Sequence, residues 1–327
     1  MKRLLVVAAG LGLALAVAII AYEGLAAVAE AFAAVGFGLA VVVVLRAVEI
    51  AGAGLGWWIV FPPGSRSHPL YVCVWVRFIR EAINTLLPVA QVGGEIVGAR
   101  IITFFGIAAG VAGATVLVDI LMQVVSLFLF VIVGVGILAT YGADDALVGS
   151  MMAGISIMGV ALAGFFVAQR FGGAKLIDRA LMMAAAKFGW SSLANMASLH
   201  DNLVRIYADV PRFVVAMLVH IAVWFFGALE VLVALNLMGY PVSYLDAVVI
   251  ESLGQAVRAA GFLIPGALGV QEAGFIAVCA VFGIPAPEAL ALSLVKRVPE
   301  IVLGPPFLFA WHAHEARALL QRRPVKP

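Results

Sequence analysis

The feature that most constrains this chain is the recurrence of apolar runs long enough to cross a lipid bilayer. Residues 4–22 contain no charged side chain. Further apolar runs occupy residues 35–61, 106–140, 148–168, 213–238 and 287–311. An α-helix of about 20 apolar residues spans the hydrocarbon layer. Because 65% of the 327 residues are hydrophobic and only 12% are charged, a soluble domain is excluded. We predict an all-α, polytopic membrane bundle with about six full spans.

The first apolar run follows Lys2 and Arg3, as a signal peptide would. The run is long for a signal-peptide core and no clear cleavage site follows it, so we expect a retained first helix. A short acidic loop containing Glu23 and Glu30 should follow. The two cysteines lie in apolar sequence without metal-like spacing, which argues against a disulfide framework.

Residues 77–100 cannot form an ordinary spanning helix. Pro88, Gly93 and Gly94 interrupt the segment, and a helix in hydrocarbon must satisfy its own backbone hydrogen bonds. The segment is also unusually polar for its apolar surroundings, with Arg77, Arg80, Glu81, Asn84, Gln91, Glu95 and Arg100. Such groups are tolerated inside a membrane only where protein or water surrounds them. We therefore predict a broken or re-entrant helix hairpin, buried in protein or lining a wet cavity.

The second half of the chain repeats this segment. Pro88 matches Pro265, Glu95 matches Glu272, and the Phe-Gly-Ile triplet at 105–107 matches that at 282–284, all at an offset of 177 residues (265 − 88, 272 − 95 and 282 − 105). A chance match in a Gly-rich apolar chain is the alternative. The coincidence of a helix breaker, a buried carboxylate and a turn in one register favours a true repeat with a second broken hairpin.

The distribution of charge predicts the orientation of the two halves. With a cytoplasmic N-terminus, the loops expected outside contain acidic residues but no Lys or Arg, whereas the opposite loops are rich in Lys and Arg. Three full crossings separate the two prolines, so the halves should be inverted repeats. We predict one membrane domain, comprising two N-terminal helices (1–69), the first repeat with its hairpin (70–140), a span with cytoplasmic amphipathic helices (141–211) and the second repeat with its hairpin (212–327). Both termini should be cytoplasmic, in a bacterial inner membrane.

Several residues have expected local roles. Arg46 and Glu49 are three residues apart on one helix face, where a structural ion pair is favoured over a substrate role. Asp119 and Gln123 share a face that should turn toward the first hairpin. His220 is expected to be a core residue.

The only sizeable polar segment, residues 170–212, contains apolar side chains at helical spacing. These are Leu203, Ile206, Tyr207 and Val210. The pattern predicts an amphipathic helix on the membrane surface, and residues 175–187 resemble it.

The sequence lacks the signatures of hydrolases, NTPases and redox enzymes. His312, His314 and Glu315 could be drawn as a metal corner, but they follow the last span, and we expect no metal, cofactor or enzymatic activity. No nucleic-acid partner is expected. What remains is a set of cations in or near the membrane, namely Arg77, Arg80, Arg100, Arg258, Lys296 and Arg297. Together with helix N-termini, arginines suit an anionic lipid headgroup.

Carboxylates accompany these cations along the sequence. They are Glu81, Glu95, Asp119, Glu251, Glu272 and Glu300. Two roles stay open. The carboxylates could neutralise the cations in a buried network, or Glu95 and Glu272 could exchange partners or take up protons as the site fills and empties.

At these residues the sequence resembles the lysylphosphatidylglycerol synthase transmembrane, flippase-like family, most closely its hopanoid-biosynthesis-associated branch. The resemblance rests on two runs. The first comprises Arg80, Asn84, Pro88, Gly93, Gly94 and Glu95, and the second comprises Pro265, Gly266, Leu268, Gly269 and Glu272. The resemblance implies the binding or movement of a polar lipid across the inner membrane. Because the chain ends soon after the last span, it does not imply synthesis of lysylphosphatidylglycerol.

The resulting hypothesis is a lipid translocase in which two hairpins form a midplane cavity for an anionic phospholipid, a hopanoid or a polyprenyl phosphate. The predicted substrate-binding residues are Arg77, Arg80, Glu81, Asn84, Pro88, Gln91, Gly93, Gly94, Glu95, Arg100, Asp119, Glu251, Arg258, Pro265, Gly266, Gly269, Gln271, Glu272, Lys296, Arg297 and Glu300. The alternatives are a small-solute or ion-coupled transporter, and an enzymatic or accessory subunit that works with lipid-biosynthesis enzymes.

Overall fold

The computed structural model describes residues 25–63, 70–87, 92–141, 199–261 and 264–321, with short helical pieces between 149 and 167. In these residues every regular element is a helix. The predicted first helix (4–22) and the predicted surface helix at 175–187 lie outside the described residues. Of the predicted span at 148–168, the structure describes short helical pieces between 149 and 167.

Within the described residues, three helices are long and apolar enough to cross a membrane: α3 (Gly38–Val60), α6 (Ala109–Thr140) and α10 (Val210–Leu237). They confirm three of the predicted spans. Their outward faces are apolar, as illustrated by Val44 (60% exposed) and Leu218 (58% exposed). A large exposed apolar surface is what a lipid-facing helix requires. The chain is therefore a multi-pass membrane protein.

The last predicted span is α13 (Ala286–Gln321), which continues ten residues beyond the predicted end at 311. Lys296, Arg297 and Glu300 lie within it, and three prolines interrupt its backbone hydrogen bonding. This helix therefore combines the length of a membrane span with a polar middle section.

Both segments predicted to be broken are broken. In the first half, α4 (Leu70–Leu86) and α5 (Gly93–Thr103) are separate helices. In the second half, the 3-10 turn η3 (Pro265–Ala267) separates α11 (Tyr244–Ala260) from α12 (Val270–Ala280). Gly266 (φ 61°) and Gly269 (φ 76°) have left-handed backbones, which glycine adopts without strain. At about 1.5 Å per residue, none of these four helices reaches the ~30 Å of a bilayer core.

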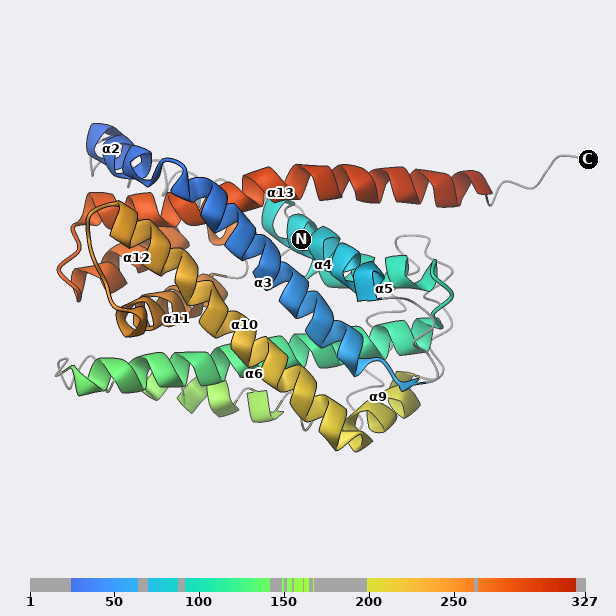
Figure 1. Ribbon diagram of the computed structural model, residues 1–327. Helices are drawn as coiled ribbons and strands as arrows, with labels where there is room; N and C mark the ends of the chain where they lie inside the picture. The colour runs from blue at the N-terminus through green and yellow to red at the C-terminus, as the bar shows by residue number, and fades with distance from the viewer. Residues whose placement is uncertain are drawn as a thin grey trace, which may run out of the picture.

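The helix boundaries follow the repeat inferred from the sequence. Starting at 93 and 270, α5 and α12 differ by 177 residues, as do α6 and α13, which start at 109 and 286. The turns before α6 and α13 both contain a left-handed glycine, Gly106 (φ 84°) and Gly283 (φ 67°). Figure 1 shows α6 and α13 running in opposite directions, and α3 antiparallel to α10. This geometry supports an inverted relation between the halves.

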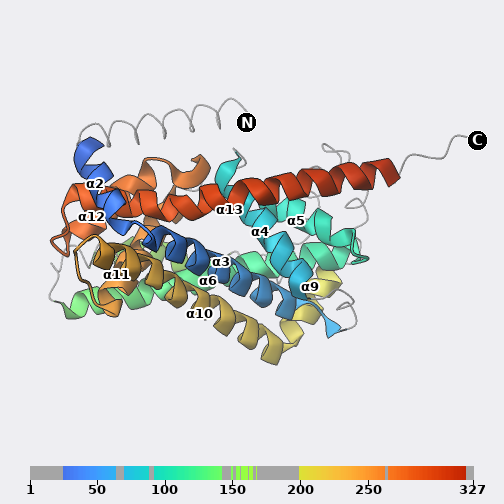
Figure 2. The same ribbon diagram turned by 45° about the horizontal axis from the view of Figure 1, so that its top comes forward.

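The broken helix pair α4–α5 lies on one side of the molecule and α11–α12 lies on the other (Figures 1 and 2). The turn η3 contacts α4. A β-carbon added at Gly266 would lie 3.4 Å from the backbone oxygen of Thr85. The helices α3 and α10 pack against each other beside this junction. Apolar clusters fill both sides of it, one around Phe130 and Phe275 and the other around Trp57 and Ile79.

The N-terminal region differs from the prediction. We expected an acidic loop at residues 23–30, but α2 (Leu25–Val35) is helical. The sequence LAAVAEAFAAV is rich in alanine, the strongest helix former, and a single glutamate does not offset this propensity. The helix ends before Gly36, which has a φ of 47°, and Val28 packs against α13.

The amphipathic helix is confirmed but is shorter than predicted. It is α9 (Leu199–Ala208), with Leu203 and Ile206 buried. Val210 belongs instead to α10. The two helices are separated at Asp209, which is the N-cap residue of α10. Its carboxylate accepts a hydrogen bond from the backbone N–H of Arg212 at 3.4 Å, and Pro211 lies in the first turn of α10. An N-cap followed by proline is a strong helix-start signal.

Candidate functional site

A cavity of about 550 Å³ lies where the broken helix pairs and the long helices meet. Side chains from α3, α4, α5, α6, α10 and α11 line it. The polar ones are Arg46, Glu49, Arg77, Glu81, Asn84, Thr85, Glu95, Gln123, His220, Gln255 and Arg258. Ile50, Ile120 and Trp224 belong to its apolar lining. The cavity thus draws residues from both halves of the chain.

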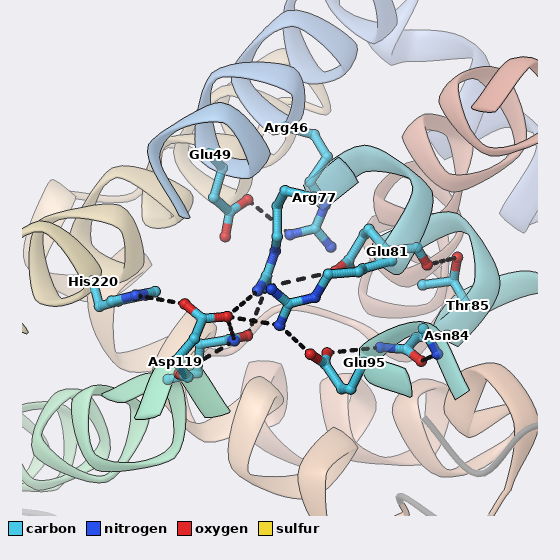
Figure 3. Close-up of polar contacts among 12 residues, drawn as sticks. Arg46, Glu49, Arg77, Glu81, Asn84, Thr85, Glu95, Asp119 and His220 are labelled. Carbon is cyan, nitrogen blue, oxygen red and sulfur yellow. Dashed lines mark hydrogen bonds and ion pairs between the residues drawn. The ribbon is translucent and has the colours of Figure 1, made fainter. Parts of the chain in front are cut away.

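Asp119 organises the wall of the cavity contributed by the first half. It is fully buried, and its Oδ2 accepts hydrogen bonds from Arg80 at 2.6 Å, Arg77 at 3.2 Å and Gln123 at 2.9 Å. Its other oxygen lies 3.1 Å from Nε2 of His220 on α10 (Figure 3). Asp119 and Gln123 therefore face the first hairpin, as the sequence predicted. Two arginines and a histidine converge on one carboxylate.

The break between α4 and α5 is fixed by polar contacts. The Glu95 carboxylate pairs with Arg80 and accepts a hydrogen bond from Asn84 Nδ2 at 3.2 Å. Asn84 in turn accepts a hydrogen bond from the backbone N–H of Gly94 at 2.8 Å. Gly94 permits the close approach, since an added β-carbon would lie 2.2 Å from the Arg80 backbone oxygen. The Arg80 guanidinium also stacks over Trp57, 4.7 Å from the ring centroid.

The second half contains a different buried cluster centred on Lys296. Its Nζ lies 2.7 Å from Glu230 and 2.9 Å from Glu251. All three side chains are at most 1% exposed. Gln255, which lines the cavity, donates a hydrogen bond to Glu251 at 2.8 Å. At the repeat offset of 177, Lys296 occupies the position of Asp119, so equivalent buried positions carry opposite charges.

Two further pairs hold the second break. Arg258 donates hydrogen bonds to Glu300 at 2.7 Å and to Gln271 at 3.1 Å. Arg297 donates hydrogen bonds to Glu272 at 2.7 Å and to the backbone oxygen of Gly266 at 3.0 Å.

The carboxylates Glu95 and Glu272 both lie in the first turn of a helix. Glu272 also accepts a hydrogen bond from the N–H of Gly269 at 2.6 Å. A carboxylate is stabilised at a helix N-terminus. The sequence suggested that these helix N-termini bind a lipid headgroup. In the structure, the carboxylates of Glu95 and Glu272 occupy that position.

The structure brings some predicted site residues to the cavity and places others elsewhere. Arg77, Glu81, Asn84, Glu95 and Arg258 line the cavity. Arg80 and Asp119 lie behind its wall, and the residues around Lys296 and Arg297 form the adjoining buried clusters. Pro88 and Gln91 lie outside the described residues. Gly93, Pro265 and Gly269 form the helix breaks and are absent from the cavity lining as the structure describes it.

Arg100 was grouped with the site cations but lies elsewhere. It pairs with Glu315 at the far end of α13, with Nε to Oε1 at 3.0 Å, and is absent from the described cavity lining. The same contact gives a structural partner to Glu315, which the sequence analysis considered and set aside as part of a metal corner. Sequence proximity to the hairpin was misleading here, because Arg100 is near the end of α5, remote from the break.

Sequence reasoning missed part of the cavity. Arg46 and Glu49 form the predicted ion pair, at 2.7 Å, but they also line the cavity. His220 is 2% exposed, as expected of a core residue, yet its ring reaches both Asp119 and the cavity. Gln255 was not singled out. Its position one helical turn after Glu251 was the available signal.

Each of the six predicted cations has a carboxylate within 4.0 Å. The carboxylates therefore neutralise the cations in a buried network, which is one of the two roles left open by the sequence. The loosest pair is Arg77 with Glu81, at 3.9 Å, where the Glu81 side chain is 29% exposed. An arginine can exchange a carboxylate for a phosphate with little change in geometry, because both accept paired N–H donors. Exchange of partners is therefore the chemistry by which these arginines would accept an anionic group.

The chain was compared with models of protein families. A model described as the lysylphosphatidylglycerol synthase TM region matches residues 5–303. Comparison with curated proteins and with solved structures found no match.

Proposed function

The chain belongs to the lysylphosphatidylglycerol synthase transmembrane family, and from this membership we propose that it is a transporter, rather than an enzyme, that moves a polar lipid between the leaflets of a membrane. The family is related to membrane lipids, and the chain is a multi-pass membrane protein. The proposal concerns the reaction, which is translocation, and the substrate class, which is a lipid with an anionic headgroup.

The observation that carries the proposal is the cavity between the two helix breaks. Its volume of about 550 Å³ falls in the ~300–1,000 Å³ range of ligand pockets. Three guanidinium groups, those of Arg46, Arg77 and Arg258, line it among carboxylates and apolar side chains. Charged groups inside a membrane protein usually mark a substrate or ion pathway. Interrupted helices that meet at the centre are the usual setting for such a site.

The ion pairs supply a mechanism for binding and release. In the structure, Arg77 contacts Glu81 and Arg258 contacts Glu300. A lipid phosphate entering the cavity would compete for the guanidinium groups, while the acyl or polyprenyl tails stay among the apolar outer faces of the helices. Release would restore the original pairs. Because each arginine keeps an anionic partner at each stage, no unpaired arginine is exposed to hydrocarbon.

The two broken pairs would provide alternating access. We propose that α4–α5 enters the bilayer from the cytoplasmic side and α11–α12 from the opposite side, with the termini in the cytoplasm of a bacterial cell. Their short helices and opposite placement support this topology. Rocking of one repeat against the other would then open the cavity to either leaflet.

A leaflet-transfer assay tests the proposal. The purified protein is reconstituted into liposomes with headgroup-labelled phosphatidylglycerol, and movement of the label between leaflets is measured. Transfer above protein-free liposomes, with little transfer of a zwitterionic analogue, is expected. Absence of transfer for phosphatidylglycerol, hopanoid and polyprenyl phosphate probes would refute lipid translocation. Uptake of a small soluble anion would instead favour a solute transporter, and chemical conversion of the lipid would favour an enzyme.

A further inference from the structure

The buried cluster around Lys296 has an imbalance of charge. Two carboxylates, Glu230 and Glu251, share a single ammonium group at 2.7 and 2.9 Å. Glu230 and Glu251 are 0% exposed and Lys296 is 1% exposed. If both carboxylates were ionised, the cluster would hold one uncompensated negative charge on buried side chains.

Neighbouring cations do not supply the missing charge. On α3, Arg46 is engaged by Glu49 of the same helix. On α11 and α13, Arg258 and Arg297 face Glu300 and Glu272, two cations for two carboxylates. From α6, Asp119 is bonded to Arg77, Arg80 and His220. Among the described residues, the excess carboxylate therefore stays with the Lys296 cluster.

One oxygen shows the same deficiency in atomic detail. Oε1 of Glu230 is buried and has no hydrogen-bond partner among the described residues. A bare carboxylate oxygen in such a place is strongly disfavoured, and a buried acid normally takes up a proton instead. When two carboxyl groups share one site, one of them retains its proton.

From this imbalance we propose that Glu230, Glu251 and Lys296 form a proton-binding site in which the two carboxyl groups share one exchangeable proton. The proton adds to a carboxylate oxygen and leaves again to water, so no bond other than O–H forms or breaks. A metal cation does not suit the site, because the Lys296 ammonium already lies within hydrogen-bond distance of both carboxyl groups.

The site has a short connection to the cavity. Gln255 lines the cavity and donates its Nε2–H to Oε1 of Glu251 at 2.8 Å. One side chain thus separates the proton site from the place where the headgroup would bind. The idea that proton binding is coupled to lipid movement rests on the proposed function. The idea that the cluster binds a proton does not.

Infrared spectroscopy of the full-length protein in lipid vesicles tests the proposal. Near neutral pH, the wild type should show the carbonyl stretch of a protonated carboxyl group, and the band should shift in D₂O. Glu230→Gln and Glu251→Gln should each lose this band, because one carboxylate then faces one ammonium. Lys296→Met should gain a second protonated carboxyl group, because two carboxylates then lack a cation.

Glu30→Gln serves as the matched control, since Glu30 is exposed on α2, and its spectrum should match that of the wild type. A wild type without the band, or a band that persists in both Glu230→Gln and Glu251→Gln, would overturn the proposal. The readout needs no lipid transport. A failed leaflet-transfer assay leaves this result intact, and a missing band leaves the proposed translocation intact.

Discussion

Replacement of Arg80 by alanine should destabilise the fold. Arg80 is 1% exposed and pairs with both Glu95 and Asp119, at 2.6 Å from the latter. Its removal leaves two buried carboxylates with one cation fewer, and breaking a buried pair costs about 3–5 kcal/mol. Asp119 retains Arg77 at 3.2 Å, so Glu95 bears most of the loss. Adding Glu95→Gln should therefore recover about 1–3 kcal/mol, the usual coupling between residues in one network.

Equilibrium unfolding in mixed detergent measures both variants. Arg205→Ala is the matched control, because Arg205 is exposed on α9, and its effect should stay within about 0.5 kcal/mol. The reasoning is refuted if Arg80→Ala is as stable as the control. It is equally refuted if the double variant is less stable than Arg80→Ala. Once Arg80 is gone, replacing the unpaired Glu95 carboxylate by a neutral amide should raise the free energy of unfolding.

Three further outcomes are expected. Gly94→Ala should lower the free energy of unfolding by about 1–3 kcal/mol, because the added β-carbon would lie 2.2 Å from a backbone oxygen of α4. Gly136→Ala is the control, because its added β-carbon has nothing within 4 Å, and its free energy of unfolding should equal that of the wild type. Unfolding in detergent measures both variants. Arg258→Gln should weaken binding of phosphatidylglycerol about 10–100-fold in a titration, as expected for about 1.5–3 kcal/mol from a charge-assisted bond, and an unchanged affinity would exclude this contact. Its loss of stability in the same unfolding assay should be smaller than that of Arg80→Ala, because Glu300 keeps Arg297 at 3.8 Å. Glu230→Gln should abolish any acceleration of leaflet transfer by an imposed pH gradient, and a gradient response equal to that of the wild type would argue against coupling through this site.

The sequence was most informative where the bilayer restricts the options. Helix breaks at Gly93 and at Pro265–Gly269, and the spans α3, α6 and α10, follow from the need to satisfy every backbone group in hydrocarbon. The repeat offset of 177 predicted the position of both breaks. The prediction of a loop at α2 was wrong because it underestimated the helix propensity of the alanine-rich sequence, which a single glutamate does not offset.

The partners of the charged residues could not be predicted in the same way. Along the sequence, Arg80 lies six residues before the end of α4 (86 − 80) and Arg100 lies seven residues after the start of α5 (100 − 93). Arg80 nevertheless pairs with Glu95 beside the break, whereas Arg100 pairs with Glu315. His220 reaches Asp119 only because α10 packs beside α6. Such contacts depend on the packing of distant helices, which hydropathy and spacing along one chain do not encode.

Photo-crosslinking tests the central claim, that the cavity receives a lipid headgroup, most directly. A phosphatidylglycerol analogue with a photoreactive headgroup is incorporated with the protein into liposomes, and the labelled residues are identified by mass spectrometry. We predict labelling of the cavity residues Ile120 and Trp224, reduced by unlabelled phosphatidylglycerol and by Arg258→Gln. Labelling confined to outward-facing side chains such as Val44 and Phe309, which are 60% and 77% exposed, and unaffected by Arg258→Gln would contradict the claim.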